Sequence, residues 1–285
     1  MKKKTLGVIG LSGAILLGSV YSISANTSGY ELYKSALKQT HQANSATMEM
    51  SFKLTDNDNS LFKMNSLYKT DVAKAVSAVT TEMANEEATS TMNMYKQDGA
   101  WFISKVGEDV IYKTEVKNPH SEASLELQDD MENLIDVLTK NLQQQITVDE
   151  AKDGVKVVEL DLTGKEIPLA ANALSSLMIK HSVMLQDRIE NDGTQFHLTP
   201  TMPALDHDIT VKQINLMAKV DGQNIIEQQT VKAIVTGKDK QGKLHELTLN
   251  MELNVKDYNN TNVSPVSIQA EKVESLDISH GNHGK

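Results

Sequence analysis

The sequence predicts an α+β protein: a single curved antiparallel sheet, or half-barrel, with about three helices packed on its concave face. Three observations predict this class. Most of the chain after residue 45 alternates apolar and polar residues, which is the period of a half-buried strand. Turn signals such as Asp98-Gly99 and Asp153-Gly154 separate the alternating runs and favour antiparallel neighbours. Only about three segments have helical spacing, too few to cover about ten strands, so the sheet should curl around them.

The first residues have the layout of a secretory signal. Lys2–Lys4 is basic, and the 21 residues of Thr5–Ala25 carry no charge and end in small side chains. Such a segment directs export and is then removed, so we expect cleavage after residue 25 or residue 24. The alternative is an uncleaved anchor, because a segment of this length can span about 30 Å of hydrocarbon. In both cases we expect a secreted or extracytoplasmic protein.

The pattern predicts three parts of the chain. Residues 1–25 form the signal peptide, residues 26–263 form one α+β domain, and residues 264–285 form a C-terminal extension whose tail we expect to be disordered. The domain begins with a helix over Ser28–Gln42. A serine followed three residues later by a glutamate forms a capping-box pattern there, and apolar residues then recur at helical spacing.

Residues 45–116 predict an antiparallel meander of about six strands. The first strand, over residues 48–54, alternates methionine, phenylalanine and leucine with charged or hydroxyl side chains. The later strands are shorter or less regular, and turn residues separate them. They are predicted over residues 61–71, 76–83, from 92, 101–106 and 110–116.

A second helix is predicted over residues 127–142, where leucine and methionine recur at every third or fourth position. A hairpin over residues 146–162 follows, and Ile167-Pro168 opens a third helix whose apolar stripe reaches residue 185. Residues 187–207 are polar and contain two prolines, so we expect mostly loop. Clean alternation then predicts strands over residues 214–220, 231–235 and 247–255.

The apolar side of the predicted sheet has an unusual composition. Aromatic residues make up only 4% of the chain, whereas methionine occurs 13 times. Flexible thioethers suit surfaces that accept varied apolar shapes, so the space between sheet and helices is either an ordinary core or a cavity for a hydrophobic ligand. For the cavity, the candidate ligand-binding residues are Met48, Met50, Phe52, Met92, Met94, Trp101, Leu134, Leu138, Leu174, Met178, Leu249 and Met251.

The order of elements resembles the LolA/LppX-like carriers, exported proteins in which helices cap a half-open antiparallel barrel. The segment YELYKSALKQT from Tyr30, leading into MEMSFKL from Met48, also resembles the start of exported proteins of Gram-positive bacteria that share this layout. The resemblance spans residues 28–258. It implies a carrier that binds a lipid or a lipoprotein acyl chain without catalysis. Many relatives are lipoproteins, but this chain has no cysteine for lipid attachment.

Composition excludes several functions. The formal net charge is −10 and Arg188 is the only arginine, which is unsuited to gripping nucleic acid phosphates, so we expect no nucleic acid partner. The absence of cysteine excludes disulfides, thiolate metal sites and a cysteine nucleophile. No G-x-S-x-G, H-E-x-x-H or serine–lysine motif stands in a fitting structural setting, so we expect neither an enzyme nor a cofactor.

Three patterns contain metal-ligand residue types, and we favour another interpretation of each. The M-x-M pairs that begin at Met48 and Met92 could bind Cu(I), but both continue an apolar alternation and so belong to the core. The side chains of Asp206-His207-Asp208 would point to opposite sides of an extended segment, which favours a solvated loop. His280 and His283 lie in a glycine-rich tail that we expect to be disordered.

The leading hypothesis is therefore a secreted, non-catalytic binding protein that holds a lipid or other hydrophobic small molecule between sheet and helices. The alternative is an extracytoplasmic protein-interaction or signalling module with a fully packed core, whose partner is another exported protein. A membrane surface is a further candidate partner, because lysines gather at the turn of Lys238–Lys243, although we favour a solvent-exposed hairpin tip there.

Overall fold

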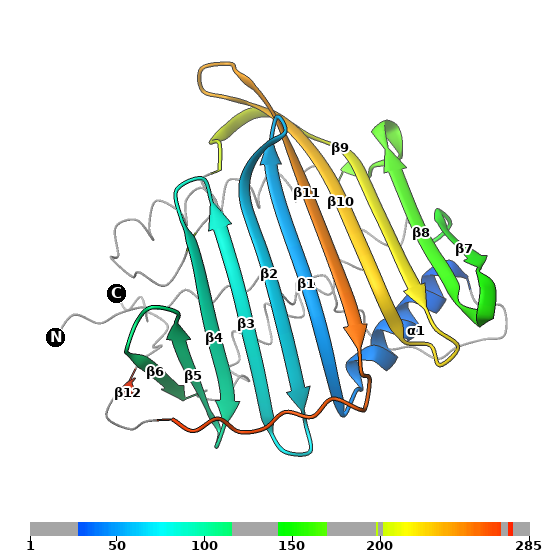
Figure 1. The fold of residues 1–285 in the computed structure, drawn as a ribbon. Coiled ribbons are helices and arrows are strands. Elements are labelled where there is room, and N and C mark those ends of the chain that lie inside the picture. Colours follow the sequence, from blue (N-terminus) through cyan, green and yellow to red (C-terminus); the bar gives the residue numbers. More distant parts are fainter. Residues whose placement is uncertain (1–27, 116–141, 170–197, 199–201, 269–272, 276–285) are drawn as a thin grey trace, which may run out of the picture.

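The computed structural model describes residues 28–115, 142–169, 198, 202–268 and 273–275 (Figure 1). These residues form one sheet of 12 strands, and one α-helix lies wholly within them. The prediction of an α+β fold with about three helices on the concave face is therefore wrong, because the described chain is nearly all sheet with a single helix. The second and third predicted helices fall almost entirely outside the described residues. No helix in the described part of the chain is long and apolar enough to cross a membrane.

The single helix, α1 (Gly29–His41), is the one predicted at the start of the domain. The hydroxyl of Ser28 caps it by accepting a hydrogen bond from the backbone N–H of Glu31 at 3.3 Å. Its buried side contains Leu32, Ala36 and Leu37, which pack against the strands at one end of the sheet. In Figure 1 the helix lies behind these strands, so it covers one face of the sheet at that end only.

The strands form two antiparallel meanders. The first comprises β1 to β6 and confirms the predicted six-stranded run; the second comprises β7 to β11. Pairing of β1 with β11 joins the meanders, and β12 adds a short parallel strand beside β6. The bounds are β1 Ser45–Asp56, β2 Asn59–Asp71, β3 Val76–Asn85, β4 Thr89–Gln97, β5 Ala100–Lys105, β6 Ile111–Glu115, β7 Ile146–Glu150, β8 Lys156–Thr163, β9 Leu205–Val220, β10 Ile226–Asp239, β11 Leu244–Lys256 and β12 Val273–Ser275.

The sheet order is β12-β6-β5-β4-β3-β2-β1-β11-β10-β9-β8-β7. The tight turns predicted from sequence account for most neighbours. At the β4–β5 turn, Asp98 and Gly99 have φ values of 51° and 73°, the left-handed conformations that a two-residue hairpin turn requires. The order places β1 and β11 in the middle of the sheet and leaves β7 and β12 at its edges.

Strands β9 and β10 are longer than the alternation predicts. β9 already begins at Leu205, so the end of the predicted loop is strand. The pairing of β9 with β10 contains several register shifts, and Asp208 has a φ of 57°. Such bulges add a residue to one strand and break the period of two, which hides the strand from pattern analysis.

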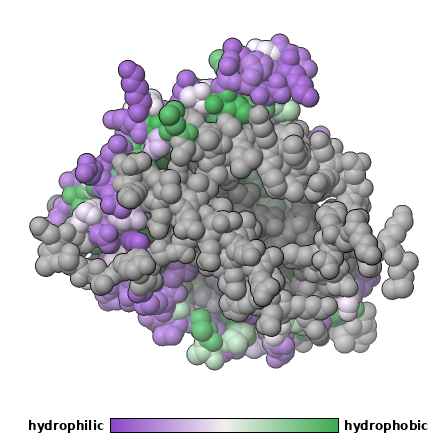
Figure 2. Space-filling model, turned by 180° about the vertical axis from the view of Figure 1, so that it is seen from behind, coloured by the Kyte–Doolittle hydropathy of each residue, from purple (hydrophilic) through white to green (hydrophobic). Residues whose placement is uncertain are grey.

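The sheet has one apolar and one polar face. On the apolar face, one buried cluster lies under β1–β6 and includes Met64, Met83 and Met92, whereas a second cluster lies under α1. The other face is lined mainly by charged, amide and hydroxyl side chains. Seen from behind, the described residues at the rim of the molecule are mostly hydrophilic with a few hydrophobic patches between them (Figure 2).

Candidate functional site

A row of apolar side chains crosses the middle of the sheet on its apolar face. Cross-strand pairing aligns Phe52 of β1, Met251 of β11, Val231 of β10, Leu216 of β9 and Leu160 of β8. We call these five residues the apolar row. All five are only half-buried, although the rows on either side contain fully buried residues. The apolar row is therefore the part of this face at which an apolar molecule can gain contact area.

A neighbouring row contains an amide in an otherwise apolar setting. It runs from Met50 through Leu253, Gln229 and Ala218 to Val158. Gln229 is 0% exposed, and its Oε1 accepts a hydrogen bond from the hydroxyl of Tyr33 in α1 at 2.9 Å. The Nε2 of Gln229 is buried without a hydrogen-bond partner. Burial raises the pKa of Tyr33 well above its usual range, despite the opposing effect of the hydrogen bond to Gln229.

The structure places eight of the twelve predicted ligand-binding residues on the apolar face. Met92 is part of the buried cluster under β1–β6, and four others pack against that cluster, whereas the remaining three lie elsewhere on the same face. The four that pack against it are Met50, Phe52, Met94 and Leu249, and the remaining three are Met48, Trp101 and Met251. The other predicted residues, Leu134, Leu138, Leu174 and Met178, lie outside the described residues.

A hollow of about 740 Å³ crosses six strands, β2, β1, β11, β10, β9 and β8. Most of its lining residues carry their side chains on the polar face, among them Lys53, Lys63 and Lys232. Lys53 and Lys63 are direct cross-strand partners, an arrangement of like charges that disfavours the sheet slightly. Hydrogen bonds from Asn254 and Gln228 lower the pKa of Glu252 in the same lining. The lining also includes all five residues of the apolar row, so both polar and apolar side chains belong to it.

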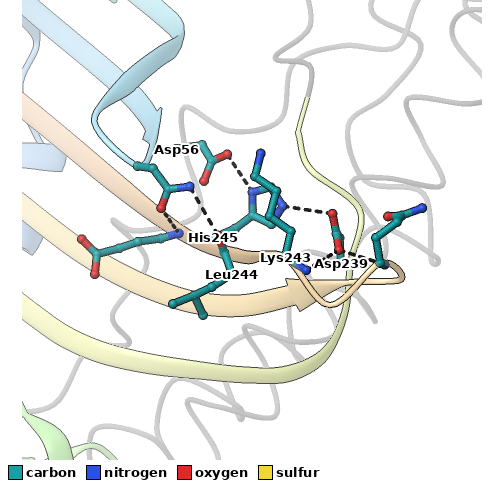
Figure 3. Close-up of polar contacts among 8 residues, drawn as sticks. Asp56, Asp239, Lys243, Leu244 and His245 are labelled. Carbon is teal, nitrogen blue, oxygen red and sulfur yellow. Dashed lines mark hydrogen bonds and ion pairs between the residues drawn. The ribbon is translucent and has the colours of Figure 1, made fainter.

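A buried histidine lies between two carboxylates at one end of the sheet (Figure 3). His245, which is 5% exposed, has its Nδ1 at 2.7 Å from Oδ2 of Asp56 and its Nε2 at 3.4 Å from Oδ2 of Asp239. Burial acts to raise the pKa of Asp239, but hydrogen bonds from the backbone of Lys243, from His245 and from the backbone of Gln241 bring the pKa below its ordinary value.

The same region ties two turns together. The side-chain amide of Asn57 donates to the carbonyl of Leu244 and its oxygen accepts from the backbone N–H of Glu246. With His245 bridging the ends of β1 and β10, these contacts lock the β1–β2 turn onto the β10–β11 hairpin. The oxygen Oδ1 of Asp56 is buried without a partner, which is the one unsatisfied position in this lock among the described residues. We interpret the cluster as structural.

The described residues do not bring the three sequence patterns with metal-ligand residue types together into a metal site. Among the described residues, no group of three or more histidine, aspartate or glutamate side chains could hold a metal ion. Asp206 and Asp208 flank His207 in β9, where Asp208 pairs with Lys238 at 2.8 Å and Asp206 lies 3.6 Å from the His207 ring. The two M-x-M pairs lie on the apolar face with the core clusters. His280 and His283 lie outside the described residues.

Sequence patterns missed Gln229 and the cluster of His245, Asp56 and Asp239, which we call the histidine lock. A signal for Gln229 exists, because it precedes Val231, Ala233 and Val235 at a spacing of two and so extends their apolar side. For the lock, Asp56 and Asp239 look like ordinary turn residues, and only the pairing of distant strands brings them to His245.

No family model matches the chain, and the comparison with curated proteins found no match. Among solved structures, a LolA superfamily protein from Nitrosomonas europaea is similar, with 8% sequence identity over 83% of this chain and 95% of that chain. It belongs to the superfamily that the order of elements resembles. The TM-score of 0.23 is too low to carry an argument, so neither fold nor function is assigned from this match.

Proposed function

We propose that the protein binds a hydrophobic ligand, a lipid or another long apolar molecule, on the apolar row and performs no catalysis on it. The observation that carries the proposal is the row of five half-buried apolar side chains in the middle of the sheet. Strands lie about 4.8 Å apart, so a row across five strands is about 19 Å long. That length suits an extended chain better than a compact ligand.

The chemistry of the apolar face supports the same proposal. Met251 lies in the apolar row, Met50 lies in the neighbouring row, and both are half-buried. Thioether side chains of this kind adapt to ligands of varied shape. The opposite face is polar, so the sheet keeps one side in water while the other side meets the ligand. A chain with this division of faces can carry an apolar molecule through an aqueous compartment.

We also propose that the protein works outside the cytoplasmic membrane. The basis is the basic start Lys2–Lys4 followed by the uncharged segment Thr5–Ala25. N-terminal sequencing of the protein recovered from the culture medium and from membranes tests this. A start at residue 25 or 26 in the medium supports export with cleavage, and full-length protein confined to the cytoplasm contradicts it.

The binding experiment compares two substitutions at adjacent positions of β10. Val231→Lys places a charge in the apolar row, and Thr230→Lys places the same charge on the polar face beside Glu252. Loss of ligand contact at the half-buried Val231 should remove about 1.5 kcal/mol of binding free energy, which corresponds to about a tenfold loss of affinity. Binding of a fluorescent long-chain fatty acid to the full chain should weaken that much in Val231→Lys and stay unchanged in Thr230→Lys.

Two results would contradict the proposal. Equal affinities for both variants would place the ligand elsewhere, and an absence of saturable binding in the unmodified protein would remove the ligand altogether. In the second case, an organic extract of the purified protein without co-purified lipid, measured by mass spectrometry, would leave the competing interpretation as a protein-interaction module. Circular dichroism and melting temperature show that both variants are folded before binding is compared.

A further inference from the structure

Gln229 is an amide buried in the apolar face without its full set of hydrogen bonds. It is 0% exposed, and in the sheet register its neighbours are Leu253 and Ala218, which offer no polar side-chain atoms. An unpaired buried amide donor is unfavourable, and the hydrogen bond that Oε1 accepts from Tyr33 does not relieve it. The position therefore calls for an explanation that packing alone does not supply.

Tyr33 forms a hydrogen bond with only one of the two polar atoms of this amide. Its hydroxyl donates to Oε1 of Gln229 at 2.9 Å, and the Nε2 has no partner among the described residues. The single hydroxyl satisfies one of the two amide atoms whichever way the amide is turned.

Gln229 lies in the row next to the apolar row. Gln229 and Val231 are two residues apart on β10 and share the apolar face, so their backbones lie about 7 Å apart. The cluster under α1 also reaches Leu216, so the part of the face under α1 adjoins the apolar row there. A chain lying along the apolar row brings its polar end to the edge of this covered region.

We propose that Gln229 donates a hydrogen bond from Nε2 to a neutral carbonyl oxygen of the bound ligand, the ester carbonyl of an acyl lipid whose chain lies along the apolar row. This inference rests on the proposed function and names its ligand class. A carbonyl supplies the missing acceptor, and an amide donor matches it without a buried charge. A free carboxylate fits less well, because the register neighbours Leu253 and Ala218 carry no cation to offset its desolvation.

The test compares two lipids that differ only at the carbonyl. The probes are 1-palmitoyl lysophosphatidylcholine, which has an ester, and its 1-O-hexadecyl ether analogue, which has none. Each displaces a fluorescent apolar dye from the full chain below its micelle concentration. A buried hydrogen bond contributes about 0.5–1.5 kcal/mol, so the unmodified protein should bind the ester about 2- to 12-fold more tightly than the ether.

Matched variants then locate that preference. Gln229→Met removes the donor, and Gln228→Met removes the adjacent amide, which donates to Glu252 Oε1 at 3.0 Å. The ester preference should vanish in Gln229→Met, with ether binding retained, and should persist in Gln228→Met. Gln229→Met also removes the acceptor of the Tyr33 hydroxyl, so circular dichroism and melting temperature must show that the variant is folded before binding is compared.

The outcomes separate this inference from the proposed function. Equal binding of ester and ether by the unmodified protein, or an ester preference that survives in Gln229→Met, overturns the inference while saturable binding still supports a hydrophobic ligand. No saturable binding of either lipid overturns the inference and counts against the proposed function as well.

Discussion

Replacement of Leu253 by aspartate should unfold the domain. Leu253 is 7% exposed on β11, the strand beside β1 in the middle of the sheet, and its register partners are Met50 and Gln229. Its side chain belongs to a buried cluster with Ala46 and Val255. A carboxylate at this position has no described cation across either strand pair, so its desolvation is not offset.

The magnitude follows from the burial. Truncation of a buried leucine to alanine removes transfer energy and leaves a cavity, which together destabilise a protein by about 2–5 kcal/mol. Leu253→Ala should therefore remain folded and melt roughly 4–20 °C lower, at about 2–4 °C per kcal/mol for a chain of this size. Leu253→Asp adds an unpaired buried charge, and the total approaches the 5–15 kcal/mol that typically separates folded from unfolded states.

Urea titration followed by circular dichroism measures both changes. The control is Asn250→Asp on the same strand, because Asn250 faces the polar side between Lys53 and Lys232 in the register. An added carboxylate there should be neutral or slightly stabilising. If Leu253→Asp kept the stability of the unmodified protein, or lost no more than Asn250→Asp, the assignment of the two faces of β11 would be wrong.

Three further predictions concern stability. His245→Phe leaves the buried Asp56 carboxylate without its partner and should lower the free energy of unfolding, measured by urea titration, by about 1.5–3 kcal/mol. An unchanged free energy of unfolding would show that the histidine lock is dispensable. The pKa of Asp239 is lowered in the folded state, so its stabilising effect is present above the unfolded pKa of about 3.9 and is lost as the pH falls through the folded pKa. In Asp239→Asn, the free energy of unfolding should therefore depend less on pH in the acid range. A pH profile equal to that of the unmodified protein would contradict the network around His245. Gly29→Ala would favour a free helix, but its Cβ would lie 2.6 Å from the carbonyl oxygen of Ile146. The free energy of unfolding should therefore fall by about 1–3 kcal/mol, and a higher melting temperature would refute that contact.

Local patterns identified most of the strands and several of the turns. Alternation identified β1 and β11, and Asp98-Gly99 identified the β4–β5 turn, because both depend on residues within a few positions of each other. The same patterns placed Met50, Phe52 and Met251 on one face. The pairing of β1 with β11 spans about 200 residues, and nothing local specifies it.

Helix content and the polar positions were harder to predict. Apolar spacing predicted second and third helices at residues 127–142 and 167–185, which lie almost entirely outside the described residues. The described chain contains a single helix on a twelve-stranded sheet, so the predicted α+β class was wrong. Bulges in β9 and β10 shift the period and hid the start of β9 at Leu205. Gln229 looked like an ordinary polar residue, because its burial depends on Tyr33 from α1 and on strands that are distant in the sequence.

Methyl NMR of the methionines tests most directly whether the apolar row holds a hydrophobic ligand. Met251 lies in the apolar row, Met50 stands in the next row, and Met217 faces the opposite, polar side opposite Thr230 and Glu159. A nitroxide-labelled stearate should broaden the methyl signals of Met251 and Met50 in a saturable way and leave Met217 sharp. Broadening of Met217 alone, or equal broadening of all three, would contradict binding on the apolar row.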